Sequence, residues 1–168
     1  DSDIVKVDKY EPHKIANGKN DATFFVASDD IDMADLQRYR QETQTEYLIA
    51  ITTTNKDYDC LKLADNVILC SPNEVQLVMQ AFQLLHSGSG IIGMDWNEVK
   101  WAISSGRNIE FLHGMASGEN CVALACEQLI PKLKNLSSNY PIKNVMINMY
   151  ADISFGCEQQ DFIIQQID

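Results

Sequence analysis

Three short, apolar, β-rich runs constrain the fold of this chain most, because they recur at the spacing of a parallel sheet. They are "ATFFVAS" (22–28), "YLIAITTT" (47–54) and "NVILC" (66–70). Near-continuous apolar runs of this kind are typical of strands that are buried on both faces of a sheet. The spacers between them have the length of helical crossovers, and "DDIDMADLQRYRQET" in the first spacer predicts a cap and a helix. The pattern therefore predicts an α/β protein with a parallel sheet.

The clearest predicted helix follows the third strand. Ser71, Pro72 and Glu74 supply an N-cap, a proline suited to the first turn and a glutamate able to close a capping box. Apolar residues at helical spacing then continue as far as the glycines of "HSGSG" (86–90). A long central helix is therefore predicted over residues 71–87.

The remainder of the chain alternates again between strand-like and helix-like segments. Strands are predicted within 107–116 and 143–151, and each is followed by a helix, in "GENCVALACEQLIPKL" and "EQQDFIIQQI". We expect these elements to pack as a smaller layer, separate from the first sheet. The predicted organisation is a polar lead-in (1–20), a truncated βαβ half with a partial Rossmann-like sheet (21–70), the central helix (71–87) and a small α/β domain (88–168).

The charge of the chain limits its partners. With 24 acidic and 13 basic side chains the net charge is -11, so nucleic acid and anionic membrane surfaces are repelled on average, and we expect neither as a partner. No apolar run approaches the roughly 20 residues that span a bilayer, and the start has no signal-peptide core. Five cysteines without a C-x-x-C pair predict reduced thiols in a cytoplasmic protein rather than disulfides or a zinc site.

The segment "GMDWNEVKWAI" (93–103) carries the most specific local pattern. Asp95 and Glu98 satisfy a capping box in which Asp takes the place of Ser or Thr. Both carboxylates also face the positive end of the helix dipole. By spacing alone, a structural cap explains the pair. Trp96 and Trp101 on the same helix either bury their rings or form an interface anchor.

Other candidates for chemistry carry weaker signals. His13, His86 and His113 lie far apart without a second ligand at metal spacing, so we expect surface or hydrogen-bonded histidines. The Ser-Gly pairs at 105–106 and 117–118 lack the strand-to-helix context of a nucleophile elbow. The "GSG" at 88–90 follows a helix, whereas a phosphate loop follows a strand. We expect neither a bound metal nor a cofactor.

The order of these pieces resembles the C-terminal domain of FtsZ, the tubulin-like bacterial division GTPase. The resemblance lies in "MDWNEVKWAISSGRNIEFLHGMASGENCVALACEQLI", where the family has V-D-F-A-D-V-K/R, then G-x-A-x-x-G, then A-S/K-G-E-x-R-A and an alanine-rich helix. It continues through "IKNVMINMYADISFGCEQQDFIIQQI". Upstream, "NDATFFVAS", "EYLIAITTT" and "ADNVILCSPNE" are similar to the last strands of the family's nucleotide-binding domain. The resemblance implies a small FtsZ C-terminal-type domain and a role in cell division or filament assembly.

The chain departs from the family where the nucleotide is held. After the strand that matches "ATFFVAS", the family carries a glycine-rich loop, G-G-G-T-G-T-G, whose amides cradle the phosphates. Here "DDIDMADL" has no glycine and four acids, Asp29, Asp30, Asp32 and Asp35, which would repel a triphosphate. The resemblance and this departure together imply a pseudo-GTPase that associates with an FtsZ-like protein or with its own copies.

The resemblance also implies a role for the acidic pair. In FtsZ filaments the loop after the central helix enters the next subunit's nucleotide pocket and offers two acids that polarise the attacking water. Asp95 matches the first acid and Glu98 the second, as catalytic residues acting in trans on GTP bound by a partner subunit, while the family's preceding asparagine is Gly93 here. The implied interface consists of Gly93, Met94, Asp95, Trp96, Glu98 and Trp101. Two alternatives stay open: the C-terminal part of a complete GTPase, or a scaffold of FtsZ fold without polymer contacts.

Overall fold

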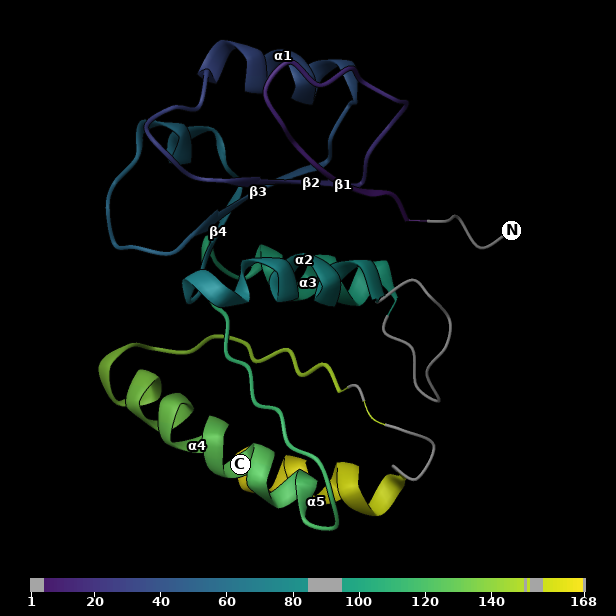
Figure 1. The fold of residues 1–168 in the computed structure, drawn as a ribbon, viewed down its shortest axis with the longest axis vertical. Coiled ribbons are helices and arrows are strands. Elements are labelled where there is room, and N and C mark those ends of the chain that lie inside the picture. Colours follow the sequence, from purple (N-terminus) through teal and green to yellow (C-terminus); the bar gives the residue numbers. More distant parts are fainter. Residues whose placement is uncertain (1–4, 85–94, 150, 152–155, 168) are drawn as a thin grey trace. The chain divides into compact units, whose positions relative to one another are not determined.

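A five-stranded, wholly parallel sheet organises the first of two units in the chain (Figure 1). The structure is a computed structural model that describes residues 5–84, 95–149, 151 and 156–167. The two units are residues 1–111 and 112–168. The predicted α/β class with a parallel sheet is confirmed.

The strands cross the sheet in the order in which they occur in the chain. They are β1 Val7–Lys9, β2 Ala22–Val26, β3 Tyr47–Thr52, β4 Asn66–Leu69 and β5 Asn108–Glu110. The helices are α1 Met33–Glu42, η1 Asp59–Leu63, η2 Pro72–Glu74, α2 Val75–Leu84, α3 Trp96–Ser104, α4 Cys121–Asn139 and α5 Cys157–Ile167, where η marks a 3-10 helix.

Burial on both faces explains why the central strands are apolar throughout. In β3, Leu48 and Ala50 point to one face while Ile49 and Ile51 point to the other, and all four side chains are fully buried. Successive side chains of a strand alternate between faces, so a strand in the middle of three layers needs apolar residues at every position.

The two faces of the sheet are covered by different helices (Figure 1). Helices α1 and η1 pack on the face of the sheet that carries Leu48. From α1, Leu36 and Tyr39 are part of the core on this face. Helices α2 and α3 pack on the face of Ile49, where the Phe82 ring of α2 lies 4.9 Å from the Phe24 ring of β2. The predicted central helix is formed as η2 followed by α2, and residues 85–87 lie outside the described residues.

This arrangement gives the sheet connections of opposite hand. All the strands are parallel and each connection moves to the next position in the same direction. The β2–β3 connection runs through α1 on one face, whereas the β4–β5 connection runs through α2 and α3 on the other. One of these two connections is therefore left-handed, which is rare in parallel sheets.

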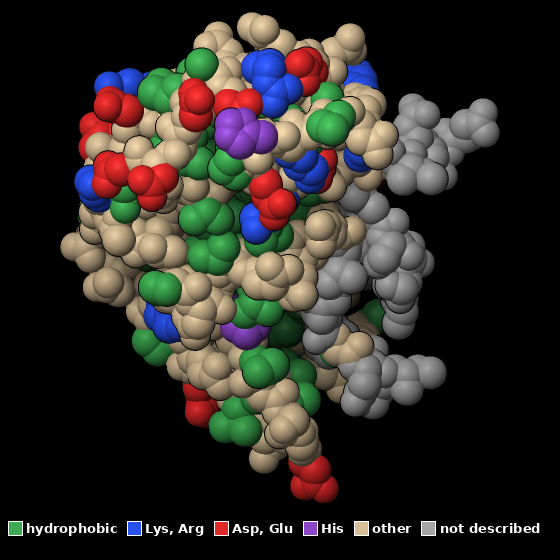
Figure 2. Space-filling view, turned by 45° about the horizontal axis from the view of Figure 1, so that its top comes forward, with side chains coloured by type: hydrophobic (Ala, Val, Ile, Leu, Met, Phe, Trp, Pro, Cys, Tyr) green, Lys and Arg blue, Asp and Glu red, His purple; other side chains and the backbone are tan. Residues whose placement is uncertain are grey.

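Strand β1 and the connection that follows it, both predicted as part of a polar lead-in, are fastened to α1 by two tyrosine hydroxyls. Tyr10 Oη donates to Asp35 Oδ2 at 2.6 Å, and Tyr39 Oη donates to Asp8 Oδ2 at 2.6 Å. The two rings meet edge to face with centroids 5.6 Å apart. Figure 2 shows charged side chains of both signs gathered near the top of the view, the side on which Figure 1 places α1.

Buried polar side chains join the same connection to the far end of α1. Asn20 Nδ2 donates to Thr23 Oγ1 at 3.1 Å, and the Thr23 hydroxyl lies 2.7 Å from that of Thr45, which lies 2.7 Å from that of Thr43. All four residues are buried. Because buried hydroxyl and amide groups need hydrogen-bond partners, this chain of bonds fixes the position of Asn20 relative to α1 and β3.

The prediction of a separate layer from residue 88 onwards is wrong for its first strand. The strand predicted within 107–116 is formed as β5, but it pairs in parallel with β4, with Ile109 opposite Ile68. Val99 and Ile103 of α3 pack on the same sheet. The boundary between the units falls after Phe111, because Ile109 of β5 and the adjacent Phe111 pack against the first core.

The second unit consists of α4, α5 and extended segments. Gln128 of α4 holds one of these segments, because its side-chain amide donates to Met115 O at 3.0 Å and accepts from Met115 N at 3.1 Å. The strand predicted within 143–151 is not formed in the described residues, where 141–149 belong to no sheet. A strand requires a neighbouring strand, and the described part of this unit contains none.

Candidate functional site at the start of α3 and the carboxyl edge of the sheet

The predicted capping box at the start of α3 is formed in full. Asp95 has the extended backbone of an N-cap, and its Oδ1 accepts from Glu98 N at 2.9 Å. In return, Glu98 Oε2 accepts from Asp95 N at 2.9 Å. These bonds satisfy two amides that a helix start leaves without partners. The structural interpretation of the pair is therefore confirmed.

The cap leaves part of each carboxylate available to a partner. Asp95 and Glu98 are both exposed, and their second oxygens, Oδ2 and Oε1, make no hydrogen bond within the described residues. Two carboxylates held rigidly by reciprocal bonds present a fixed pair of acceptors to an incoming donor, because little side-chain entropy is left to lose on binding.

The two tryptophans of α3 lie in different environments. Trp96 is buried in the first core, where its ring meets the Tyr47 ring edge to face with centroids 6.1 Å apart. Trp101 is 68% exposed. Trp96, Val99 and Ile103 recur at helical spacing on the buried face, and Trp101 falls outside that phase.

The predicted interface set is therefore only partly assembled at the surface. Asp95, Glu98 and Trp101 follow one another at intervals of three residues, so they line one exposed stripe of the helix. Trp96 belongs to the core instead. Gly93 and Met94 lie outside the described residues.

A second region of interest is the carboxyl edge of the sheet, where open parallel sheets usually bind ligands. The loop after β2 leads there into α1. Asp32 caps this helix, with its Oδ1 accepting from Ala34 N at 2.9 Å and from Asp35 N at 3.2 Å. The first amides of α1 thus already bind a carboxylate. A phosphate could bind at this helix start only by displacing that carboxylate.

Two further acids of this segment, Asp29 and Asp35, are also engaged by neighbours. Asp29 pairs with Lys56 from the loop after β3, and this hydrogen bond raises the pKa of Lys56. Hydrogen bonds from Tyr10, from Arg38 and from the main chain of His13 hold the pKa of Asp35 well below its ordinary value. Asp35 therefore stays ionised as a structural clamp for the β1–β2 connection.

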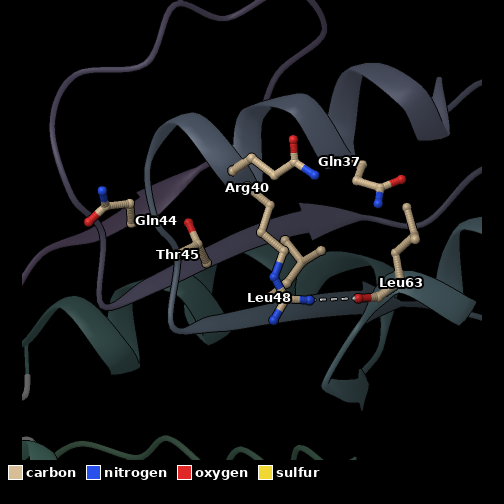
Figure 3. A pocket seen from close by; sticks show the side chains of 7 residues that line it. Gln37, Arg40, Gln44, Thr45, Leu48 and Leu63 are labelled. Carbon is tan, nitrogen blue, oxygen red and sulfur yellow. Dashed lines mark hydrogen bonds between the residues drawn. The ribbon is translucent and has the colours of Figure 1, made fainter.

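The hollow shown in Figure 3 lies at the opposite, amino-terminal side of the sheet. It has a volume of about 470 Å³ and includes Gln37, Gln44 and Thr45 in its lining. Its cation, Arg40, donates to Leu63 O at 3.1 Å and to Asp65 Oδ2 at 2.8 Å. Because this guanidinium is already paired within the protein, the hollow offers no evident anchor for an anionic ligand.

The remaining candidates from the sequence do not converge on a site. His13 contributes its main-chain amide to Asp35, with a left-handed φ of 60°, and His86 lies outside the described residues. The five cysteines are free thiols; Cys60, Cys70 and Cys126 are buried, and Cys157 is exposed. Within the part of the chain that is described, no group of three His, Cys, Asp or Glu side chains is placed to hold a metal ion.

Sequence reasoning missed the two tyrosine–aspartate bonds. Asp8, Tyr10 and Tyr39 stand in segments whose pattern predicts only a lead-in and a helix. Tyr39 could have indicated one of these bonds, because a tyrosine on the buried face of a helix needs a hydrogen-bond partner for its hydroxyl.

Comparisons with known proteins assign no family to the chain. A scan against protein-family models, a search of curated proteins and a search of solved structures each gave no match. A functional proposal for this chain therefore depends on the start of α3, on the carboxyl edge of the sheet and on the sequence resemblance. None of the helices in the described part of the chain is both long and apolar enough to cross a membrane.

Proposed function

We propose that this protein is a nucleotide-independent relative of FtsZ that acts by association with an FtsZ-like protein or with its own copies. The observation that carries the proposal is the cap of α1. Where the family presents glycine-loop amides to the phosphates, this chain presents Asp32, already bonded to the first amides of the helix. An internal carboxylate in that place excludes a phosphate both by occupancy and by charge.

The proposed contact is the exposed stripe of α3, formed by Asp95, Glu98 and Trp101. A tryptophan exposed beside fixed acceptors suits a partner that supplies an apolar contact and hydrogen-bond donors. Trp96 supports this stripe indirectly, because its packing against Tyr47 in the core fixes the start of the helix. In the catalytic form of the proposal, the two acids also orient a water on GTP held by the partner.

The nucleotide half of the proposal is tested by calorimetry with magnesium and GTP. We expect no heat of binding at micromolar concentrations, because the amides of Ala34 and Asp35, at the start of α1 in the family's phosphate position, already bind Asp32. An active FtsZ measured in the same buffer serves as the positive control. Magnesium-dependent binding that survives added salt would contradict the proposal and favour a GTPase of which this chain is the C-terminal part.

The partner half is tested by sedimenting FtsZ filaments with the protein and following GTP turnover. We expect the wild-type chain to change pelleting or turnover, and the double variant Asp95→Asn, Glu98→Gln to lose that effect while folding normally, because amide oxygens still accept the cap bonds. Asp30→Asn with Asp57→Asn is the matched control, since it removes the same charge from exposed acids elsewhere.

Two results would count against the partner half. If the control pair abolishes the effect as well, general charge rather than the α3 stripe is responsible. If the wild-type chain changes neither pelleting nor turnover at equal concentration, the scaffold alternative is the better account.

A further inference from the structure

The connection between β1 and β2 contains the only Asn-Gly pair of the chain, Asn17 and Gly18. Both residues are exposed, and Gly18 has a left-handed φ of 77°, which glycine adopts without strain. Within the described part of the chain, neither the Asn17 side-chain amide nor the Gly18 main-chain amide makes a hydrogen bond. An electrophilic carbon, Asn17 Cγ, and a nucleophilic nitrogen, Gly18 N, are thus unengaged side by side in the chain.

A cation lies beside this pair. Lys6, which immediately precedes β1, donates from its ammonium to Asn17 O. The ammonium is also close to Gly18, because a Cβ built on that glycine would lie 3.6 Å from Lys6 Nζ. Negative charge collects on Asn17 O when the Gly18 amide loses its proton, since both atoms belong to one conjugated peptide group. The bond from Lys6 therefore stabilises the ionised form of the nucleophile.

Asn20, three positions further along, has the opposite arrangement. It is fully buried, and its side-chain amide donates to Thr23 Oγ1 at 3.1 Å. The main-chain amide that follows it, Asp21 N, donates to Lys6 O at 2.9 Å. Because both reactive groups are engaged at Asn20, the same chemistry is blocked there, and Asn17 is the reactive asparagine of the connection.

We propose that Asn17 is a site of spontaneous deamidation that Lys6 promotes. Gly18 N gives its proton to water and forms a bond to Asn17 Cγ, and Asn17 Nδ2 takes up a proton and leaves as ammonia. One water molecule opens the resulting succinimide ring. Its attack on Cγ gives aspartate, and its attack on the Asn17 main-chain carbon gives isoaspartate, whose main chain is longer by one carbon. The net reaction consumes one water and releases one ammonia.

The fold accommodates either product, because the connection is fastened on both sides of Asn17. Before it, Lys14 Nζ pairs with Asp8 Oδ1 at 2.6 Å. After it, Asn20 N donates to Thr43 O at 2.9 Å. The additional main-chain carbon of isoaspartate is absorbed between these two anchors. The reaction therefore replaces a neutral amide by a carboxylate beside the Lys6 ammonium and leaves the sheet intact.

The test incubates the full wild-type chain at neutral pH and follows its tryptic peptides by mass spectrometry. Lys19 lies between the two asparagines, so trypsin places Asn17 and Asn20 in different peptides. We expect the Asn17 peptide to gain the mass difference between an amide and a carboxylate, and to separate by chromatography into aspartate and isoaspartate forms. The Asn20 peptide should stay unchanged. An intact Asn17, or equal conversion of Asn20, would overturn the proposal.

The role of Lys6 is tested by its removal. Lys6→Gln should slow conversion in the folded chain about fivefold, the factor expected when one unit charge about 4 Å from a developing charge in water is lost. Lys6→Arg keeps the charge and should keep most of the rate. Lys9→Gln is the matched control, since Lys9 pairs with Glu11 at 3.5 Å and does not contact Asn17.

The same variants in concentrated urea separate the folded contact from the local sequence. All four chains should convert at one rate there, because the bond from Lys6 to Asn17 exists only in the folded protein, whose integrity circular dichroism checks in each variant. A folded Lys6→Gln chain that reacts as fast as wild type, or faster, refutes the promoting role. An equal loss of rate in Lys9→Gln would also refute it, since general charge would then be responsible.

Discussion

Removing the Tyr39 hydroxyl should weaken the first unit by an amount that the geometry sets. Tyr39 is fully buried on the inner side of α1, and its Oη donates to Asp8 Oδ2 at 2.6 Å. Phenylalanine keeps the ring and its packing against Tyr10, so Tyr39→Phe deletes one hydrogen bond to a charged group. Such bonds contribute about 1.5–3 kcal/mol to stability.

The expected loss lies toward the lower end of that range. The Asp8 carboxylate also accepts from Lys14 Nζ at 2.6 Å and is 22% exposed, so it keeps one ionic partner and regains water in the variant. We therefore expect a loss of about 1–2 kcal/mol in the free energy of unfolding. With a urea dependence of about 1.5 kcal/mol per M for a unit of this size, the midpoint should fall by about 1 M.

The hydrogen bond between Tyr39 and Asp8 should make the stability of the first unit depend on pH in both the acid and the alkaline range. Burial acts to raise the pKa of Asp8, but hydrogen bonds from Lys14, Tyr39 and the Lys9 main chain outweigh it and leave the pKa below its ordinary value. The stability from this shift is present above the unfolded pKa and is lost as pH falls through the folded one. Burial and the Asp8 bond raise the pKa of Tyr39 to about 12, so its contribution is complete below about pH 10 and is lost as pH rises toward 12.

The difference in stability between wild type and Tyr39→Phe should thus be largest near neutral pH and shrink at both extremes. Urea titrations from acid to alkaline pH, followed by circular dichroism, measure it. Tyr58→Phe is the control, because the Tyr58 hydroxyl makes no hydrogen bond in the described part of the chain. A difference below about 0.3 kcal/mol, or one that does not change with pH, would refute the reasoning.

Three further predictions concern the helices. Trp96→Ala should cost about 3–5 kcal/mol of unfolding free energy and Trp101→Ala less than about 0.5 kcal/mol, because only Trp96 is buried; urea unfolding of both variants measures this. Gly114→Ala should destabilise the second unit by about 1–3 kcal/mol, since the new Cβ would lie 2.8 Å from Ala125 O, and hydrogen exchange of the α4 amides reports it. Pro131→Ala should stabilise α4 by about 1–3 kcal/mol, because proline inside a helix removes a backbone hydrogen bond, and this should appear as slower exchange in that helix.

The sheet could be predicted from the sequence where burial alone determines the pattern. The apolar runs of β2, β3 and β4 were recognisable because a strand between two layers has no polar side, and the two capping boxes followed from their spacing. The place of β5 could not be predicted in this way. A three-residue strand with Asn108 and Glu110 exposed on either side of Ile109 carries too little pattern to tell which sheet it joins.

The candidate site was predictable in its local part only. The reciprocal bonds of Asp95 and Glu98 depend on neighbours three residues apart, so their residue types suffice. The separation of Trp96 from Trp101 depends instead on which side of α3 meets the sheet, and that phase is set by Tyr47 and by the rest of the first core. Lys56 and Asp29 are 27 positions apart, and local sequence gives no sign that they pair.

The coincidence of sheet order with chain order bears on how the first unit is made. As the chain leaves the ribosome, each strand from β2 onwards finds its neighbour already synthesised. The interval is long between β4 and β5, and the edge of β4 stays exposed while α2 and α3 are added. Synthesis up to Phe111 is thus the earliest point at which the nascent sheet loses that exposed edge, and a pause or a chaperone contact would have its greatest effect in the interval between these two strands.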